Sequence, residues 1–75
     1  MATKQQTNII NYIVICISDF ASQFDMTQKD AFHFLYTYGG ISFLIEHYEI
    51  EHTLNLDDTI EALAHICRKN GGLLA

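Results

Sequence analysis

The chain has 75 residues and a formal net charge of −5 at pH 7, and 49% of its residues are hydrophobic while only 17% are charged. A chain of this length buries about 60% of the surface that it exposes when unfolded, which excludes a second domain and most self-sufficient enzymes. Four Lys and Arg against nine Asp and Glu argue against a nucleic-acid-binding face. The absence of proline excludes proline-rich ligand motifs.

The first predicted element is a helix over residues 8–24, preceded by a polar segment, residues 1–7, that we expect to be flexible. The helix contains no glycine or proline and is longer than most strands. Its apolar run from Ile9 to Ile17 is too short for the ~20 residues of a membrane span, so we expect a core helix of a cytoplasmic protein without membrane contact. A helix that is apolar on two faces is central to its bundle or forms a subunit contact. Two rows at helical spacing are present, the first with Ile10, Ile13, Val14, Ile17, Ala21 and Phe24 and the second with Ile9, Tyr12, Cys16 and Phe20.

A second helix is predicted from Thr27 to about Tyr38. Thr27 and Asp30 have the spacing of a capping box, and Gly39-Gly40 can adopt the left-handed conformation that ends a helix. Its inward face is predicted to carry Ala31, Leu35 and Tyr38 with Phe34 beside them, and its second, aromatic row to carry Phe32 and Tyr36.

Two further helices are predicted in the second half of the chain, separated by an extended or turn segment over residues 48–54. One covers Ile41 to about Tyr48. The other begins at residues 55–58 and ends at residues 70–72, followed by a tail, residues 72–75, and its acidic start and basic end complement the helix dipole. The predicted fold is all-α, a compact bundle of about four short helices in a single domain, residues 1–75. The inward face of the last helix is predicted to carry Ile60, Leu63, Ala64 and Cys67.

Four histidines raise the question of a metal site, and the densest group combines His47 and His52 with Glu49 and Glu51. Residues five positions apart lie about 140° apart around a helix, so His47 and His52 reach one ion only across a turn. We therefore predict no metal and no cofactor, but a solvated acidic turn in which one histidine makes a connecting hydrogen bond. A metal-binding or metal-sensing domain that uses His47 and His52 is kept as an alternative function.

No catalytic residues are predicted, because the sequence has no nucleophile elbow, Walker loop or GxGxxG pattern. Cys16 and Cys67 match no CxxC or zinc-ligand pattern, and we expect both to be buried as small apolar residues. A helix-turn-helix outline surrounds Gly39-Gly40, and a DNA-binding regulator is the second alternative. The helix after that turn has no Arg, Lys, Asn or Gln to read bases, so we predict no nucleic-acid partner.

The strongest charge signal is an acidic stretch, residues 46–61, which holds six Asp and Glu and no Lys or Arg. Such a stretch most often forms a solvated surface, and the alternative is a surface that steers a basic partner. Aromatic residues are enriched at protein interfaces, and a domain this small need not bury all of them. The candidate interaction surface consists of Tyr12, Phe20, Phe32, Tyr36, Glu46, Glu49 and Glu51.

Four short motifs follow one another in the second half of the chain: Tyr38-Gly39, then residues 44–48 (LIEHY), then His52-Thr53, then the acidic helix start Asp57-Asp58. This arrangement resembles a family of very short bacterial proteins of unknown function. The likeness extends over most of the chain, from about residue 9 to residue 67. The sequence departs from the family pattern at Glu51, where the resemblance implies an apolar residue.

The resemblance implies a small helical companion protein with no assigned activity and no catalytic residues. Members of the family look like partners of neighbouring gene products, including toxin-like ADP-ribosyltransferase relatives, which implies an antitoxin-like role. It also implies a structural part for His52-Thr53, in which a ring nitrogen and a hydroxyl satisfy backbone groups between two helices. The sequence thus predicts a non-enzymatic protein–protein interaction module that binds another protein or a second copy of itself.

Overall fold

The structure of this protein, a computed structural model, describes residues 4–73 and folds them into five α-helices with no strand among them. The predicted all-α compact bundle is confirmed, with one short additional helix. Residues 1–3 of the predicted flexible segment and residues 74–75 of the predicted tail lie outside the described residues. The helices are α1 (Lys4–Gln23), α2 (Gln28–Thr37), α3 (Gly40–Glu46), α4 (Tyr48–Glu51) and α5 (Leu56–Lys69).

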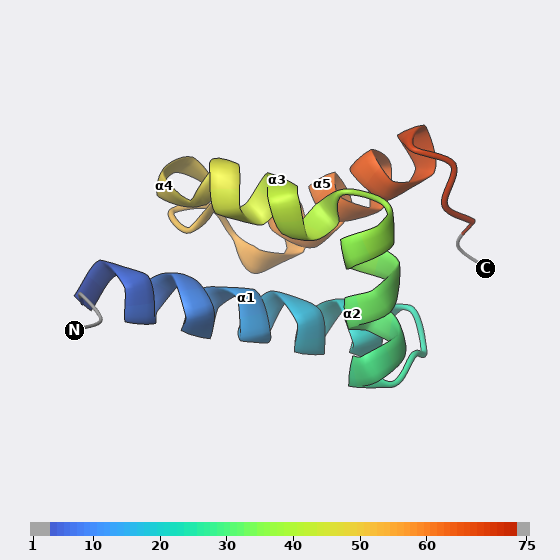
Figure 1. Ribbon diagram of the computed structural model, residues 1–75, viewed down its shortest axis with the longest axis horizontal. Helices are drawn as coiled ribbons and strands as arrows, with labels where there is room; N and C mark the ends of the chain where they lie inside the picture. The colour runs from blue at the N-terminus through green and yellow to red at the C-terminus, as the bar shows by residue number, and fades with distance from the viewer. Residues whose placement is uncertain (1–3, 74–75) are drawn as a thin grey trace.

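The helices are arranged in two layers that α2 connects. In Figure 1, α1 runs along one side of the molecule, and α3, α4 and α5 lie together on the other side. The axis of α2 is bent by 107° from that of residues 8–23 in α1. Within residues 4–73 no single helix is long and apolar enough to cross a membrane, and only this bent pair passes by length and composition.

The predicted helix ends are stabilised by the polar and glycine residues that the sequence places there. The Thr27 hydroxyl accepts a hydrogen bond from the backbone N–H of Asp30 at 3.1 Å, and the Asn55 side chain accepts one from the N–H of Asp57 at 2.8 Å. These caps satisfy N–H groups that have no partner within their helix. Gly39 has a φ of 86°, which a residue without a Cβ adopts at low steric cost, and this allows the chain to reverse between α2 and α3.

One hydrophobic core lies between the two layers. The inward face predicted for the last helix is confirmed, because α5 buries Ile60, Leu63, Ala64 and Cys67. Of the face predicted for the second helix, α2 buries Ala31 and Leu35, while Phe34 and Tyr38 are partly buried against the core. Cys16 and Cys67 are both buried, fully shielded from solvent and unpaired, as expected for small apolar residues in a core. The buried residues are Cys16, Phe20, Ala21, Ala31, Leu35, Leu44, Ile60, Leu63, Ala64 and Cys67.

The orientation of α1 differs from the first apolar row that the sequence suggested. The buried side of α1 takes residues from both rows: Cys16 and Phe20 of the second row and Ala21 of the first are buried. Ile13, Ile17 and Phe24 of the first row pack against the core, whereas Ile10 and Val14 of the same row are 58% and 55% exposed. Phe20 is therefore removed from the candidate interaction surface. Both rows are apolar, so the spacing alone could not choose between them. The contacts of α1 with α2, α3 and α5 decide which residues of the two rows are buried.

Helix boundaries differ from the predictions at three places. α1 begins at Lys4, inside the segment expected to be flexible, and α3 ends at Glu46, two residues before its predicted end. In the segment 48–54, expected to be extended or a turn, residues 48–51 form α4, because the N–H groups of Glu51 and His52 donate to the carbonyls of His47 and Tyr48 at 2.8 and 2.9 Å. Residues 52 and 53 form a turn, and residue 54 forms a bend. Alternating apolar and acidic residues over so short a segment suit both conformations, and these local hydrogen bonds select the helical one.

Two adjacent residues of α3 test the position of the core. Leu44 is fully buried and Ile45 is 55% exposed. We expect Leu44→Ala to lower the free energy of unfolding by about 2–5 kcal/mol, because it leaves a cavity, and Ile45→Ala to change it by about 0.5 kcal/mol or less. Urea denaturation followed by circular dichroism measures both values. Equal losses for the two variants would contradict the inward orientation of Leu44.

Candidate functional site

The side chains of the two residues that follow the short helix α4 form hydrogen bonds with its backbone carbonyls. The Nδ1–H of His52 donates to the carbonyl of Tyr48 at 2.6 Å, and the hydroxyl of Thr53 donates to the carbonyl of Ile50 at 2.7 Å. The His52 ring also stacks on the Tyr48 ring, with centroids 4.5 Å apart and planes 15° apart. The structural part expected for His52-Thr53 is thus confirmed, since both side chains satisfy carbonyls at the end of this helix.

A chain of polar contacts beneath α4 connects it with α1 and α5. The Tyr12 hydroxyl donates to the hydroxyl oxygen of Thr59 at 3.3 Å, and the Thr59 hydroxyl donates to the backbone carbonyl of Glu51 at 3.5 Å. The rings of Tyr12 and Tyr48 meet edge to face, with centroids 5.4 Å apart. These contacts hold α4 against the bundle.

Glu51 is buried, although the sequence placed it on the candidate interaction surface. Its exposed fraction is 8%, and its Oε1 atom has no hydrogen-bond partner. The cause is helical geometry: Glu51 follows Tyr48 by three residues, so both lie on the inward face of α4, while Glu49 and Ile50 are exposed. An apolar residue, which the family resemblance implies at this position, suits such an environment better than a carboxylate does.

Burial also changes the acid–base behaviour of nearby groups. Removal from water raises the pKa of the Tyr12 hydroxyl to about 12. It also raises the pKa of the Cys16 and Cys67 thiols from 9.0 to about 11, because the low-polarity interior disfavours a charged thiolate. Both thiols therefore stay protonated at neutral pH, and a protonated thiol is a poor nucleophile and metal ligand.

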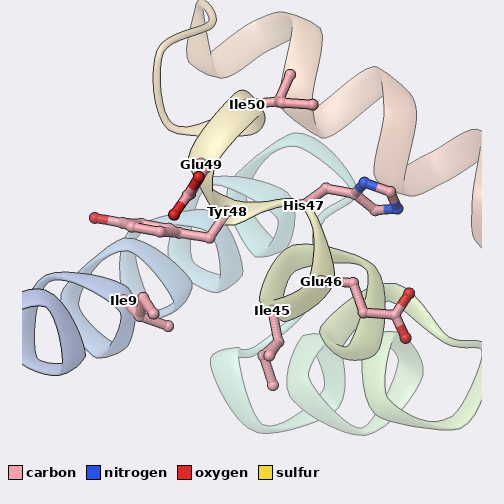
Figure 2. A pocket seen from close by; sticks show the side chains of 7 residues that line it. All are labelled: Ile9, Ile45, Glu46, His47, Tyr48, Glu49 and Ile50. Carbon is pink, nitrogen blue, oxygen red and sulfur yellow. The ribbon is translucent and has the colours of Figure 1, made fainter.

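A hollow of about 320 Å³ opens on the surface between the N-terminal half of α1 and the α3–α4 segment, and we call it the α4 hollow. Ile45 and Ile50 are 55% and 62% exposed. Figure 2 shows the Glu49 carboxylate beside the Tyr48 ring, and Glu46 and His47 pointing to the other side. The lining of the hollow thus contains exposed apolar side chains and two exposed carboxylates, of which Glu49 lies on the Tyr48 side and Glu46 points to the other side. Its lining residues are Ile9, Ile45, Glu46, His47, Tyr48, Glu49 and Ile50.

The candidate surface residues do not form one surface. Glu46 and Glu49 line the α4 hollow, whereas Phe32 and Tyr36 lie on α2, at the opposite end of the molecule in Figure 1. Phe32 and Tyr36 are 44% and 68% exposed, and their ring centroids are 5.9 Å apart. Tyr12 is half-buried in the polar contacts beneath α4.

Sequence reasoning missed the apolar part of the α4 hollow. Ile45 falls within the predicted third helix and Ile50 within the predicted extended or turn segment, yet both are exposed, and Ile9 of α1 lines the hollow with them. One sequence signal could have indicated this surface. Ile45 and Ile50 stand among glutamates, whereas a fully solvated face would carry polar residues at such positions.

The residues of the alternative metal site face different directions. Glu51 is buried and Glu49 is exposed, and the Nδ1 of His52 is occupied by the Tyr48 carbonyl. Within residues 4–73 no three His, Cys, Asp or Glu side chains are grouped so that they could hold a metal ion. In the helix-turn-helix outline, α3 has only seven residues, and its one charged side chain is Glu46.

Comparison with known proteins identifies one family. The profile of a family described as "Protein of unknown function (DUF3791)" matches residues 6–70 of the chain. No match was found among the curated proteins or among the solved structures. The matched range includes α2 to α5 and most of α1, and with them every residue of the α4 hollow.

The buried carboxylate of Glu51 leads to a stability prediction. We expect Glu51→Met to raise the free energy of unfolding by about 1–3 kcal/mol, because it removes a buried group with an unpartnered oxygen. A melting temperature higher by several degrees in a thermal scan would show this gain. The control is Glu49→Met, the same change at an exposed position, where we expect almost no gain. A lower melting temperature for Glu51→Met would show that the carboxylate stabilises the fold.

The raised thiol pKa values lead to a pH prediction. A thiol whose pKa is 9.0 in the unfolded chain and about 11 in the folded protein stabilises the fold below pH 9, and this contribution is lost as the pH rises towards 11. We therefore expect the urea midpoint to fall over this range. We also expect Cys16 and Cys67 to react with Ellman's reagent at pH 8 only after denaturation. Rapid reaction of either thiol in the native protein would contradict its burial.

Proposed function

The chain belongs to the DUF3791 family of proteins of unknown function, and within that frame we propose that it is a non-enzymatic interaction module that binds a basic amphipathic segment of another protein. The observation that carries the proposal is the α4 hollow, in which exposed isoleucines stand beside exposed carboxylates. The proposed setting is the cytoplasm.

The apolar residues of the α4 hollow supply the first part of the recognition. Ile45 and Ile50 are more than half exposed, and Ile9 and Tyr48 line the space beside them. Burying such side chains against a partner stabilises a complex by roughly 25 cal/mol per Å² of apolar surface before the costs of association. An amphipathic helix is the common occupant of such a surface, because it presents apolar residues along one face.

The charges supply the second part. Glu46 and Glu49 line the hollow, and among the residues whose side chains the structure describes, 8–73, no Lys or Arg does. The acidic stretch, residues 46–61, also contains Asp57, Asp58 and Glu61, which are all exposed. Lys and Arg place their aliphatic stems on apolar surface while their charged ends reach outward. A basic segment therefore covers the isoleucines with its stems and pairs its charges with the carboxylates. Complementary charge also accelerates the encounter of the two proteins.

A designed peptide tests the proposal directly. The probe is an amphipathic helical peptide of Leu and Lys, and its matched control is the same peptide with Glu for Lys. We expect the Leu/Lys peptide to bind, with an affinity that falls as salt screens the charges, and the Leu/Glu peptide not to bind. Fluorescence anisotropy measures both. Equal binding of the two peptides, or no binding of either, would overturn the proposal.

Paired charge variants locate the binding. We expect Glu46→Gln with Glu49→Gln to weaken binding of the Leu/Lys peptide about tenfold, which corresponds to about 1.4 kcal/mol. Asp58→Asn with Glu61→Gln removes the same two charges outside the α4 hollow and should weaken binding much less. Equal weakening by both pairs would show that net charge, rather than the hollow, attracts the peptide.

The family resemblance supports a narrower form of this proposal, an antitoxin-like companion of the product of a neighbouring gene. The test is co-expression with the product of each adjacent gene, followed by purification through a tag on this chain. We expect one such product to co-purify in a fixed stoichiometry, and Glu46→Gln with Glu49→Gln to reduce the yield. Absence of any complex with either neighbour would contradict this form and leave the peptide test to decide the broader one.

A further inference from the structure

The end of α5 is fixed to the turn between α2 and α3 by one side-chain amide. The Nδ2–H of Asn70 donates to the backbone carbonyl of Tyr38 at 2.7 Å. Gly72 is buried beside it, and a Cβ at this glycine would lie 2.8 Å from Phe34 Cζ and 3.0 Å from Tyr38 Cδ2, so the backbone lies directly on these rings. We call residues 70–72 with Phe34 and Tyr38 the α5 end contact. In Figure 1 this end of α5 lies on the side of α2, at the opposite end of the molecule from α4.

The peptide bond after Asn70 has the composition that lets a chain modify itself. Asn70 is followed by Gly71, and the backbone nitrogen after an asparagine is able to attack the side-chain Cγ. Glycine favours this attack because it has no Cβ to shield its nitrogen. Asn70 and Gly71 are both exposed, and among the described residues no atom lies within 4 Å of where a Cβ of Gly71 would be. Of the four asparagines in the sequence, only Asn70 precedes a glycine.

The folded conformation holds the reacting atoms apart. The ψ of Asn70 is 11°, which directs the Gly71 nitrogen away from the Asn70 side chain. The Gly71 N–H donates to the carbonyl of Arg68 at 3.1 Å. The Gly72 N–H donates to the carbonyl of Cys67 at 2.8 Å, and the two bonds together form a Schellman motif. Because a reaction needs its atoms in contact, the α5 end contact has to open before Gly71 is able to attack.

We propose that Asn70 is a modification site, at which the chain deamidates itself when the α5 end contact opens. In the open state the deprotonated Gly71 nitrogen attacks Cγ of Asn70. The new C–N bond closes a cyclic succinimide, the Cγ–Nδ2 bond breaks, and ammonia leaves with the proton that the Gly71 nitrogen gave up. Water then opens the ring to aspartate or isoaspartate. The net reaction converts an amide and water into a carboxylic acid and ammonia, and it involves no oxidant or reductant.

The product of this reaction does not restore the α5 end contact. An ionised carboxylate accepts hydrogen bonds and donates none, and the same holds for the Tyr38 carbonyl, so the two groups repel each other. The helix dipole also disfavours a negative charge at the C-terminal end of α5, and this charge is added to a chain whose net charge is already −5. Deamidation of Asn70 therefore keeps the end of α5 open. The site is independent of the α4 hollow.

Incubation of the folded and the unfolded chain tests the proposal. The full chain is kept in mildly alkaline buffer with and without guanidinium chloride, and peptide mapping by mass spectrometry detects the exchange of –NH2 for –OH at each asparagine. We expect Asn70 to convert in the folded protein, about tenfold or more slowly than in guanidinium because opening limits the rate. Asn55 is the internal control: its side chain also caps α5, but it precedes Leu56, so it should convert much less. No conversion of Asn70 in the folded protein, equal rates in the two buffers, or equal conversion of Asn55 would overturn the proposal.

Two glycine variants separate the opening step from the chemical step. Gly72→Ala places a methyl group against Phe34 and the Cys67 carbonyl, so it should accelerate conversion of the folded protein several-fold and leave the rate in guanidinium unchanged. Gly71→Ala places the methyl group on the attacking residue, so it should slow conversion in guanidinium several-fold. An unchanged folded-state rate for Gly72→Ala, or an unchanged guanidinium rate for Gly71→Ala, would contradict the proposed reaction.

A variant that carries the product tests the structural consequence. Asn70→Asp replaces the donor to the Tyr38 carbonyl with a carboxylate, and we expect its melting temperature to fall by several degrees while the helical circular dichroism signal is retained. Asn11→Asp adds the same charge at an exposed position of α1 and should lower the melting temperature much less. Equal melting temperatures for Asn70→Asp and the wild type would show that the modification leaves the α5 end contact intact, and would overturn this part of the proposal.

Discussion

The whole bundle depends on burying one side of α1 against a single small core. Cys16 and Phe20 of α1 are fully shielded from water beside Leu35, Leu44 and Leu63, and no second core exists among the described residues to share this task. A chain of 75 residues has too little material to surround a 20-residue helix on every side. Ile10, Val14 and Ile15 of α1 therefore stay in contact with solvent, although they are apolar.

The polar contacts beneath α4 attach this helix to the bundle, because it is too short to bury an apolar face of its own. α4 has four residues, fewer than a helix needs to be stable alone. Its end carbonyls are satisfied by His52 and Thr53, and Thr59 bonds the carbonyl of Glu51. This arrangement fixes one wall of the α4 hollow. It also encloses the Glu51 carboxylate without a partner for Oε1, at a position where an apolar side chain would pack without that cost.

The exposed groups of the protein fall into two sets with different chemistry. Around α4, isoleucines line a hollow together with Glu46 and Glu49, whereas Ile10, Val14 and Ile15 are exposed along α1, with Asp19 lining the hollow beside Val14 and Ile15. The combination of apolar residues with two carboxylates around α4 is the chemistry on which the proposed binding of a basic segment rests.

The sequence alone determined four of the five helices and much of the core, while α4 lies in a segment predicted as extended or turn. Thr27 and Asn55 as caps, the turn at Gly39, and the inward residues of α2 and α5 follow from local hydrogen bonding and from helical spacing, which depend only on neighbours along the chain. The sequence also located the structural role of His52-Thr53 through the family resemblance. Only the tertiary structure decided which residues of the two apolar rows of α1 are buried, that Glu51 faces inward, and that Ile9, Ile45 and Ile50 line one hollow. The physical reason is that burial depends on which helices pack together, and a chain with more apolar residues than its core can hold leaves that choice to contacts between residues far apart in sequence.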